Sequence, residues 1–376
     1  RPLASARAAA TLPEDDLCAT PNARAERLFV PTDTGYLGRL APDGSALTLR
    51  AGGAEGVPAG VTHGPLAFAA LHEGRRYTNP TLVWTRGERV RIELVNGLDE
   101  PTVTHWHGLQ VDTRSDGNGS FLVAPGERYL YEFEVRDRAG LYWYHPHPHG
   151  QTAAQAYRGL YGLIMVEDED ERALRSALAL APGRTEIPLV LQDRRPGTTY
   201  APSPRDYFHG LFGDEMFVNG SRCGSYLDVA TRLYRLRVLN GCNARTLLLA
   251  LRTPSGARVP FTLIGTDGGL LATPVRCEQV FLATAERIDI LVDLTDAAPG
   301  DRVVLETLGF DPMRMQMPES APTGVTSDPV LSTHTTMDPA AKGATIPCLW
   351  ETPPTHPHMR LSPKHTTIVT SLNKKR

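Results

Sequence analysis

Long apolar runs, an excess of one charge and cysteine are all scarce in this chain of 376 residues. The longest apolar run, around TLLLALRT, is far shorter than the roughly 20 residues that a membrane-spanning helix needs, so we expect no membrane partner. The formal net charge is -3 with both signs scattered along the chain, which argues against a nucleic-acid-binding surface. Composition therefore predicts a globular protein whose partners cannot be identified from its charge.

The five cysteines are widely spaced, without a CxxC pair and without a neighbouring histidine: Cys18, Cys223, Cys242, Cys277 and Cys348. The sequence leaves open whether one or two disulfides form, with one thiol left over. The start, RPLASARAAATLPEDD, lacks the apolar core of a signal peptide but fits the remainder of a cleaved one. We therefore expect a periplasmic or secreted protein.

Short runs of β-branched, aliphatic and aromatic residues, separated by turn residues, predict an all-β chain built of sandwiches. In RVRIELV the apolar Val90, Ile92 and Leu94 alternate with charged residues, as in a strand with one buried face. A charged, helical stretch near residues 167–184 is interpreted as a linker. The predicted division is 1–64 for an N-terminal extension with the first strands, 65–168 for a first domain, 169–184 for the linker, 185–310 for a second domain, and 311–376 for a mostly irregular tail rich in Met, Pro and His.

Two short runs, HWHG from residue 105 and HPHPHG from residue 145, hold five of the twelve histidines. Residues two apart on a strand point to the same face, so His105 projects with His107, and His145 with His147. Two such strands side by side would offer four imidazoles to one space, and imidazole suits copper, zinc or iron, with copper(II) favoured on intrinsic affinity. A single HxH pair is usually two ordinary histidines, but two pairs beside aromatic residues favour a polynuclear metal site.

The stretch from HWHG to GLYGLIMVED, with YTNPTLVWTRGERVRIELVNGL before it, resembles the first cupredoxin domain of laccase-like multicopper oxidases. The pieces EIPLVLQDR, GDEMFVNG, YRLRVLNGCNAR, FTLIGTDGGLLATPV and ERIDILVDL resemble the second cupredoxin-like domain, in the same order. The resemblance covers roughly residues 65–310. It implies tandem cupredoxin-like Greek-key β-sandwiches and a copper-dependent oxidoreductase that takes electrons one at a time from phenols or metal ions and reduces dioxygen to water.

The resemblance also implies a role for each site residue. His105 would be a ligand of the type 2 copper, whereas His107, His145 and His147 would be ligands of the type 3 pair. His149 lies beyond the matching positions and is interpreted as a residue at the rim of the site. Asp116, in SDGNG, matches an acidic position that helps to deliver protons to dioxygen, although an ordinary Asp-Gly turn explains it equally well.

The chain also departs from the family. Complete members take their remaining cluster histidines and the type 1 site from HPxHxHG and HCH runs in a third domain, and neither run occurs in this sequence. The late pair His356 and His358 is interpreted as part of an exposed tail. Met313, Met315 and Met317 are either linker residues or cuprous-ion ligands. Two hypotheses follow: an oxidase whose third domain lies in further sequence or in a partner chain, or a truncated, non-catalytic copper-binding protein.

Overall fold

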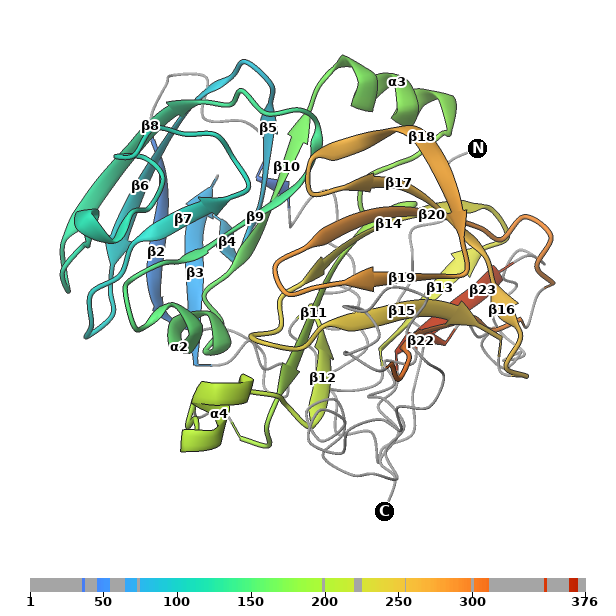
Figure 1. Cartoon of the computed structure of the whole chain (residues 1–376). Helices are drawn as coiled ribbons and strands as arrows, with labels where there is room; N and C mark the ends of the chain where they lie inside the picture. Colours follow the sequence, from blue (N-terminus) through green and yellow to red (C-terminus); the bar gives the residue numbers. More distant parts are fainter. Residues whose placement is uncertain are drawn as a thin grey trace, which may run out of the picture.

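The computed structural model describes residues 46–54, 65–72, 75–197, 200–219, 225–253, 255–298 and 301–310, together with the strand residues 36–37, 348–349 and 365–370. These residues form two β-sandwiches side by side, with the earlier strands in one and the later strands in the other (Figure 1). The prediction of an all-β fold of tandem sandwiches is confirmed. Among the described residues, no helix is long and apolar enough to cross a membrane.

The first sandwich consists of two five-stranded sheets. Its apolar core includes Phe68, Trp106, Tyr131 and Tyr144. The alternation in RVRIELV is confirmed, because Val90, Ile92 and Leu94 are buried in this core. One sheet has the order β1 (Tyr36–Leu37), β5 (Thr81–Thr85), β10 (Gly162–Glu167), β9 (Gly140–Pro146) and β7 (Thr104–His107); the other has the order β4 (Arg75–Thr78), β3 (Leu66–His72), β2 (Leu47–Gly53), β6 (Arg89–Asn96) and β8 (Arg128–Glu134).

The second sandwich encloses its own apolar core between a six-stranded sheet and a smaller sheet. The larger sheet has the order β12 (Glu215–Val218), β11 (Glu186–Arg194), β14 (Leu233–Asn240), β20 (Arg287–Asp293), β17 (Phe261–Thr266) and β18 (Gly269–Cys277). The smaller sheet has the order β16 (Arg258–Val259), β15 (Leu247–Arg252) and β19 (Gln279–Leu282), and β21 (Val304–Thr307) also pairs with β15.

Two strands come from the segment that was expected to be mostly irregular. β23 (His365–Thr370) pairs with β13 (Ser225–Ala230) on one side and with β22 (Cys348–Leu349) on the other. The remainder of residues 311–376, including the three methionines of MRMQM and the HPH run, lies outside the described residues. Cys242 and Cys277 are free thiols, and the side chains of the other three cysteines also lie outside the described part.

Helix α3 (Glu169–Ala177) lies within the predicted linker. The side chain of Asp168 caps it by accepting a hydrogen bond from the Glu171 amide, and acidic residues fill its first turn, where the positive end of the helix dipole stabilises them. Figure 1 shows α3 above the second sandwich, next to the end of β10. The expected helical stretch is confirmed, whereas its docking against the second sandwich was not indicated by its sequence pattern.

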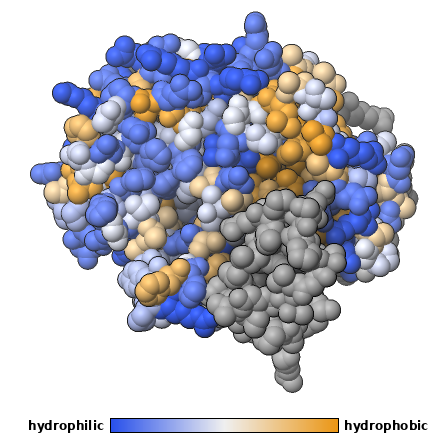
Figure 2. All heavy atoms as spheres, in the orientation of Figure 1, coloured by the Kyte–Doolittle hydropathy of each residue, from blue (hydrophilic) through white to orange (hydrophobic). Residues whose placement is uncertain are grey.

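The two sandwiches pack through apolar side chains and through backbone. One cluster joins Trp143 and Leu163 of the first sandwich to Val190 and Leu239 of the second. Where β9 meets β18, a Cβ atom added at Gly140 would lie 3.1 Å from the Gly269 Cα, so the two backbones would have to move apart by a few tenths of an ångström to admit a side chain. Outside these contacts the visible face is mainly hydrophilic, with small apolar patches (Figure 2), one of them over the short helix α4 (Pro204–His209), where Phe208 is 86% exposed.

Candidate metal centre

The two HxH motifs lie on neighbouring antiparallel strands. In the register of β7 and β9, His105 is paired with His145 and His107 with Trp143. Trp106, between the two histidines of β7, is fully buried in the first core, so alternation along the strand turns His105 and His107 to the opposite face. The prediction that the two motifs occupy adjacent strands is confirmed.

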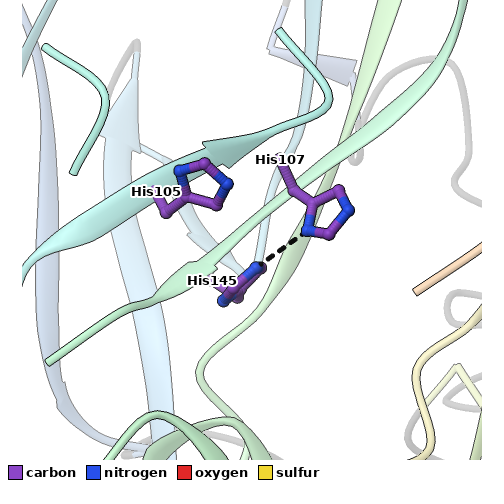
Figure 3. Close-up of side chains that lie close together, drawn as sticks. All are labelled: His105, His107 and His145. Carbon is purple, nitrogen blue, oxygen red and sulfur yellow. Dashed lines mark hydrogen bonds between the residues drawn. The ribbon is translucent and has the colours of Figure 1, made fainter. Parts of the chain in front are cut away.

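Three imidazoles converge at this point (Figure 3). One ring nitrogen from each of His105, His107 and His145 lies within 4.8 Å of one nitrogen from the others. The dashed line in Figure 3 joins His107 Nδ1 to His145 Nε2, which lie 3.2 Å apart. His147 stands beside this trio, with its ring centroid 5.2 Å from that of His105 and 6.0 Å from that of His145. The structure thus brings all four histidines of the prediction together.

Backbone carbonyls orient two of the rings. His105 Nδ1 lies 2.6 Å from the Asp116 carbonyl oxygen, and His145 Nδ1 lies 2.9 Å from the Pro146 carbonyl oxygen. Because a carbonyl only accepts, each Nδ1 carries the proton and donates it, so that Nε2 keeps its lone pair; the lone pair of His145 Nε2 faces His107 Nδ1. In each ring, the hydrogen bond from Nδ1 fixes the tautomer and the ring orientation that a metal ligand requires.

Burial keeps two of the rings neutral. Desolvation, together with the smaller effects of the positive charge of Arg287 and of the neighbouring histidines, lowers the pKa of His107 to about 4. Desolvation also holds the pKa of His145 well below its ordinary value. Neutral imidazole is the form that binds a metal, so protons do not compete strongly for these two ligands near neutral pH.

A cavity of about 360 Å³ opens next to the cluster. It is lined by His105, Asp116, His147, His149 and Thr152, with Asn118 and three glycines completing the wall. The Asp116 carboxylate lies 3.2 Å from His105 Nδ1 and is 40% exposed, so it reaches both the cluster and solvent. His149 is exposed and lines the cavity outside the trio, as His147 also does, so the interpretation of His149 as a rim residue stays a prediction.

The loop that carries Asp116 is pressed directly onto β7. Gly117 has φ +77°, and a Cβ atom there would lie 2.2 Å from the Thr104 carbonyl oxygen and 2.5 Å from the His105 Cα. Only glycine combines this backbone conformation with so close an approach. The SDGNG segment is therefore a turn that the fold requires. The same turn places Asp116 at the wall of the cavity, so the two interpretations of Asp116 are compatible.

The donor set fits copper. It consists of imidazole nitrogens, which suit copper and other late transition metals, whereas magnesium and calcium prefer oxygen ligands. Among the residues that the structure describes, no second group of three or more metal-ligating side chains comes together. The two described cysteines, Cys242 and Cys277, take no part in the cluster.

This chain is similar to known multicopper oxidases. A family model described as multicopper oxidase matches residues 70–171, the part that contains both HxH motifs. Multicopper oxidase mco of Staphylococcus aureus is 37% identical over 221 residues, which is 57% of this chain and 46% of that protein. The crystal structure of the McoA multicopper oxidase from Aquifex aeolicus matches with a TM-score of 0.65 and 35% identity, over 76% of this chain and 61% of that one. Both sandwiches of this chain are thus similar to those of multicopper oxidases.

Relatives in this family carry more than one name. Cell division protein FtsP of Escherichia coli K12 is 32% identical over 229 residues, which is 61% of this chain and 47% of that protein. The chain spans about half the length of the curated relatives it matches. The similarity to multicopper oxidases therefore supports copper as the metal but leaves the reaction to be argued from the site.

One residue near the cluster was not predicted from the sequence. Arg287, the first residue of β20 in the second sandwich, packs against the turn that follows His107. Its signal in the sequence is a charged side chain at the start of ERIDILVDL, a segment that also carries Asp289 and Asp293, so Arg287 is unremarkable without a partner in view.

Proposed function

We propose that residues 65–168 and 185–310 are the first two cupredoxin-like domains of a laccase-like oxidase that withdraws electrons singly from phenolic or metal-ion reductants and reduces dioxygen to water. The observation that carries this proposal is the convergence of two HxH pairs, from adjacent strands, beside a solvent-open cavity. Dioxygen and a small reducing substrate are the partners in this reaction, and a periplasmic or secreted location belongs to the same proposal.

In this proposal each histidine has a defined task. His105 would hold the type 2 copper, and His107, His145 and His147 would hold the type 3 pair. Bound copper supplies the one-electron redox chemistry. The chain contributes neutral imidazoles whose orientation is fixed by backbone carbonyls, and Trp143 packs 4.2 Å from the His145 ring, centroid to centroid, and shields it from solvent.

Asp116 would move protons between solvent and the cavity. Its carboxylate lines the cavity, is partly exposed, and lies next to His105 Nδ1, so a proton taken from bulk water can be passed inward over a short distance. This role depends on position, which the tight turn at Gly117 fixes.

The remaining cluster ligands and the type 1 site would come from a third domain, in further sequence or in a partner chain. Two observations support this. The chain matches only 46% of the length of its Staphylococcus aureus relative, and the printed sequence has no HPxHxHG or HCH run. The second candidate function is non-catalytic copper binding. It is favoured by the relatives named as cell division proteins and by the lack of a His–Cys group in the described part of the chain.

Copper analysis combined with dioxygen uptake tests the proposal. The protein is loaded with copper together with the third domain that the proposal requires, and bound metal is counted beside visible and electron paramagnetic resonance spectra, with His145→Gln as the matched control. A blue absorption band, about four copper ions per chain and dioxygen uptake with cuprous or phenolic reductant support the oxidase. Up to about two copper ions without uptake support the non-catalytic alternative. Failure to retain any copper, or equal binding by His145→Gln, overturns both.

A further inference from the structure

Arg287 belongs to the second sandwich but is anchored in the first. Its side chain is 3% exposed. Nε donates to the Leu141 carbonyl of β9 at 3.0 Å, across the boundary between the sandwiches. Nη1 donates to the Ala285 carbonyl at 3.0 Å and forms an ion pair with Asp267 at 2.9 Å. A planar guanidinium that donates to several acceptors at once cannot rotate without losing charge-assisted hydrogen bonds.

The end of β7 closes on this guanidinium. Gly108, the residue after His107, has φ +91°, and a Cβ atom there would lie 2.6 Å from Arg287 Nη2 and 3.0 Å from Tyr142 Cδ1. The Tyr142 ring also faces the guanidinium, with 5.7 Å between its centroid and the Arg287 Cζ. The turn after His107 is therefore wedged between an aromatic ring of β9 and a cation of β20.

The same guanidinium also holds the other histidine strand. Leu141, whose carbonyl it binds, lies on β9 together with His145, and β9 pairs with β7 through the His105–His145 register. The Arg287 side chain thus contacts β9 and the turn at the end of β7, the two strands that supply the imidazoles. Its charge is also among the causes of the lowered pKa of His107, after burial, which agrees with their proximity.

We propose that Arg287 is a positioning residue for the metal site, which sets the ends of β7 and β9 so that the His107 ring meets the His145 ring. The geometry of the guanidinium performs this task. A lysine would keep the positive charge but could not bind Leu141, Ala285 and Asp267 together from one plane. The metal-related part of this inference rests on the proposed function, whereas the placement of the ring does not require a metal.

Arg287→Lys tests the proposal with two measurements. In the metal-free protein, the ¹⁵N-labelled imidazole resonances of His107, assigned with His107→Gln, report the position of the ring. In a copper(II) titration, loss of an outer support of a ligand is expected to weaken affinity at least about tenfold. The matched control is Arg138→Lys, because Arg138 also crosses the boundary, donating to the Leu270 carbonyl at 3.2 Å, but does not contact Gly108.

We expect Arg287→Lys to shift the His107 resonances and to weaken copper binding, while Arg138→Lys leaves both as in the original chain. A folded Arg287→Lys protein with unchanged resonances and unchanged affinity overturns the proposal. If the original chain binds no copper, the proposed function fails, and the resonances alone still decide the role of Arg287. Should Arg287→Lys unfold, Asp267→Asn removes the ion-pair partner instead, and an unmoved His107 resonance in that variant overturns the proposal.

Discussion

The Glu171 carboxylate of α3 lies 3.1 Å, Oε2 to Nη2, from the Arg235 guanidinium of β14, and both side chains are fully buried. The contact continues through Arg237, which binds Asp289 at 3.0 Å and Glu186 at 2.8 Å. A helix in the predicted linker is thereby fixed to the central strands of the second sandwich by charges that water does not reach. Paired charges in such a place are costly to separate.

Glu171→Ala should therefore destabilise the chain strongly. It leaves part of the positive charge of Arg235 and Arg237 buried without a partner, for which a loss of about 3 kcal/mol in the free energy of unfolding is expected. Urea unfolding measures the loss. Glu169→Ala on the same helix is the control, since Glu169 is exposed and its removal should change stability by less than about 0.5 kcal/mol. Equal effects of the two substitutions would show that the pair does not anchor the helix.

Acid should weaken the same cluster through Glu186. Burial by itself raises the pKa of this carboxyl, but the charges of Arg237, Arg175 and Arg235 hold the pKa at about 2, below the ordinary 4.5. Between these two values the unfolded chain binds a proton that the folded chain does not. The stability contributed by ionised Glu186 is thus complete above pH 4.5 and is lost as the pH falls towards 2.

Urea midpoints measured at about pH 6 and about pH 3 test this dependence. We expect a smaller drop in stability over this interval for Glu186→Gln than for the original chain, because the variant has no carboxyl to protonate at this position. Parallel pH profiles would contradict the assignment.

Gly117→Ala should disturb the loop that carries Asp116. The new Cβ would meet the Thr104 carbonyl at 2.2 Å, in addition to the strain of φ +77°. Gly126→Ala separates these two causes, since Gly126 has φ +79° but nothing within 4 Å of the added atom. The control should lose about 1 kcal/mol from backbone strain alone, and Gly117→Ala should lose distinctly more in thermal or urea unfolding. Similar losses would mean that the loop moves away from β7 without cost.

Copper binding should distinguish the histidines of the cluster from the histidine at the rim. His107→Gln removes a nitrogen that lies within 4.8 Å of those of His105 and His145, whereas His149 lies outside this trio. We expect His107→Gln to weaken copper(II) binding at least about tenfold and His149→Gln to leave it nearly unchanged. Isothermal titration of both variants measures the difference. A larger effect at His149 would reverse the proposed roles.

The sequence was sufficient for the fold class and for the pairing of the histidine strands. Alternation in RVRIELV and in HWH depends only on the period of a strand, so the buried position of Val90 and the shared face of His105 and His107 followed directly. The ligand roles of His105, His107, His145 and His147, and that of Asp116, stay predictions, because they came from the resemblance and depend on a metal.

Contacts between distant segments were beyond the sequence. Glu171 was one acidic residue among several in DEDER, and nothing local distinguished it as the one that meets Arg235. Arg287 likewise lies 146 positions from Leu141, its hydrogen-bond partner. Local periodicity reports which face of an element is buried, but it does not report which element from elsewhere in the chain covers that face.

The contact of Gly140 with Gly269 has a consequence for protein engineering. β9 begins at this contact and reaches His145 five residues later, a rigid span of about 17 Å at the usual rise of an extended strand. One end of β9 therefore lies against the second sandwich at Gly269, and the other end carries His145 of the imidazole cluster. A chimera that grafts the first sandwich onto a foreign neighbour will inherit the histidines but not their alignment, unless the graft also brings a glycine and an arginine to meet β9.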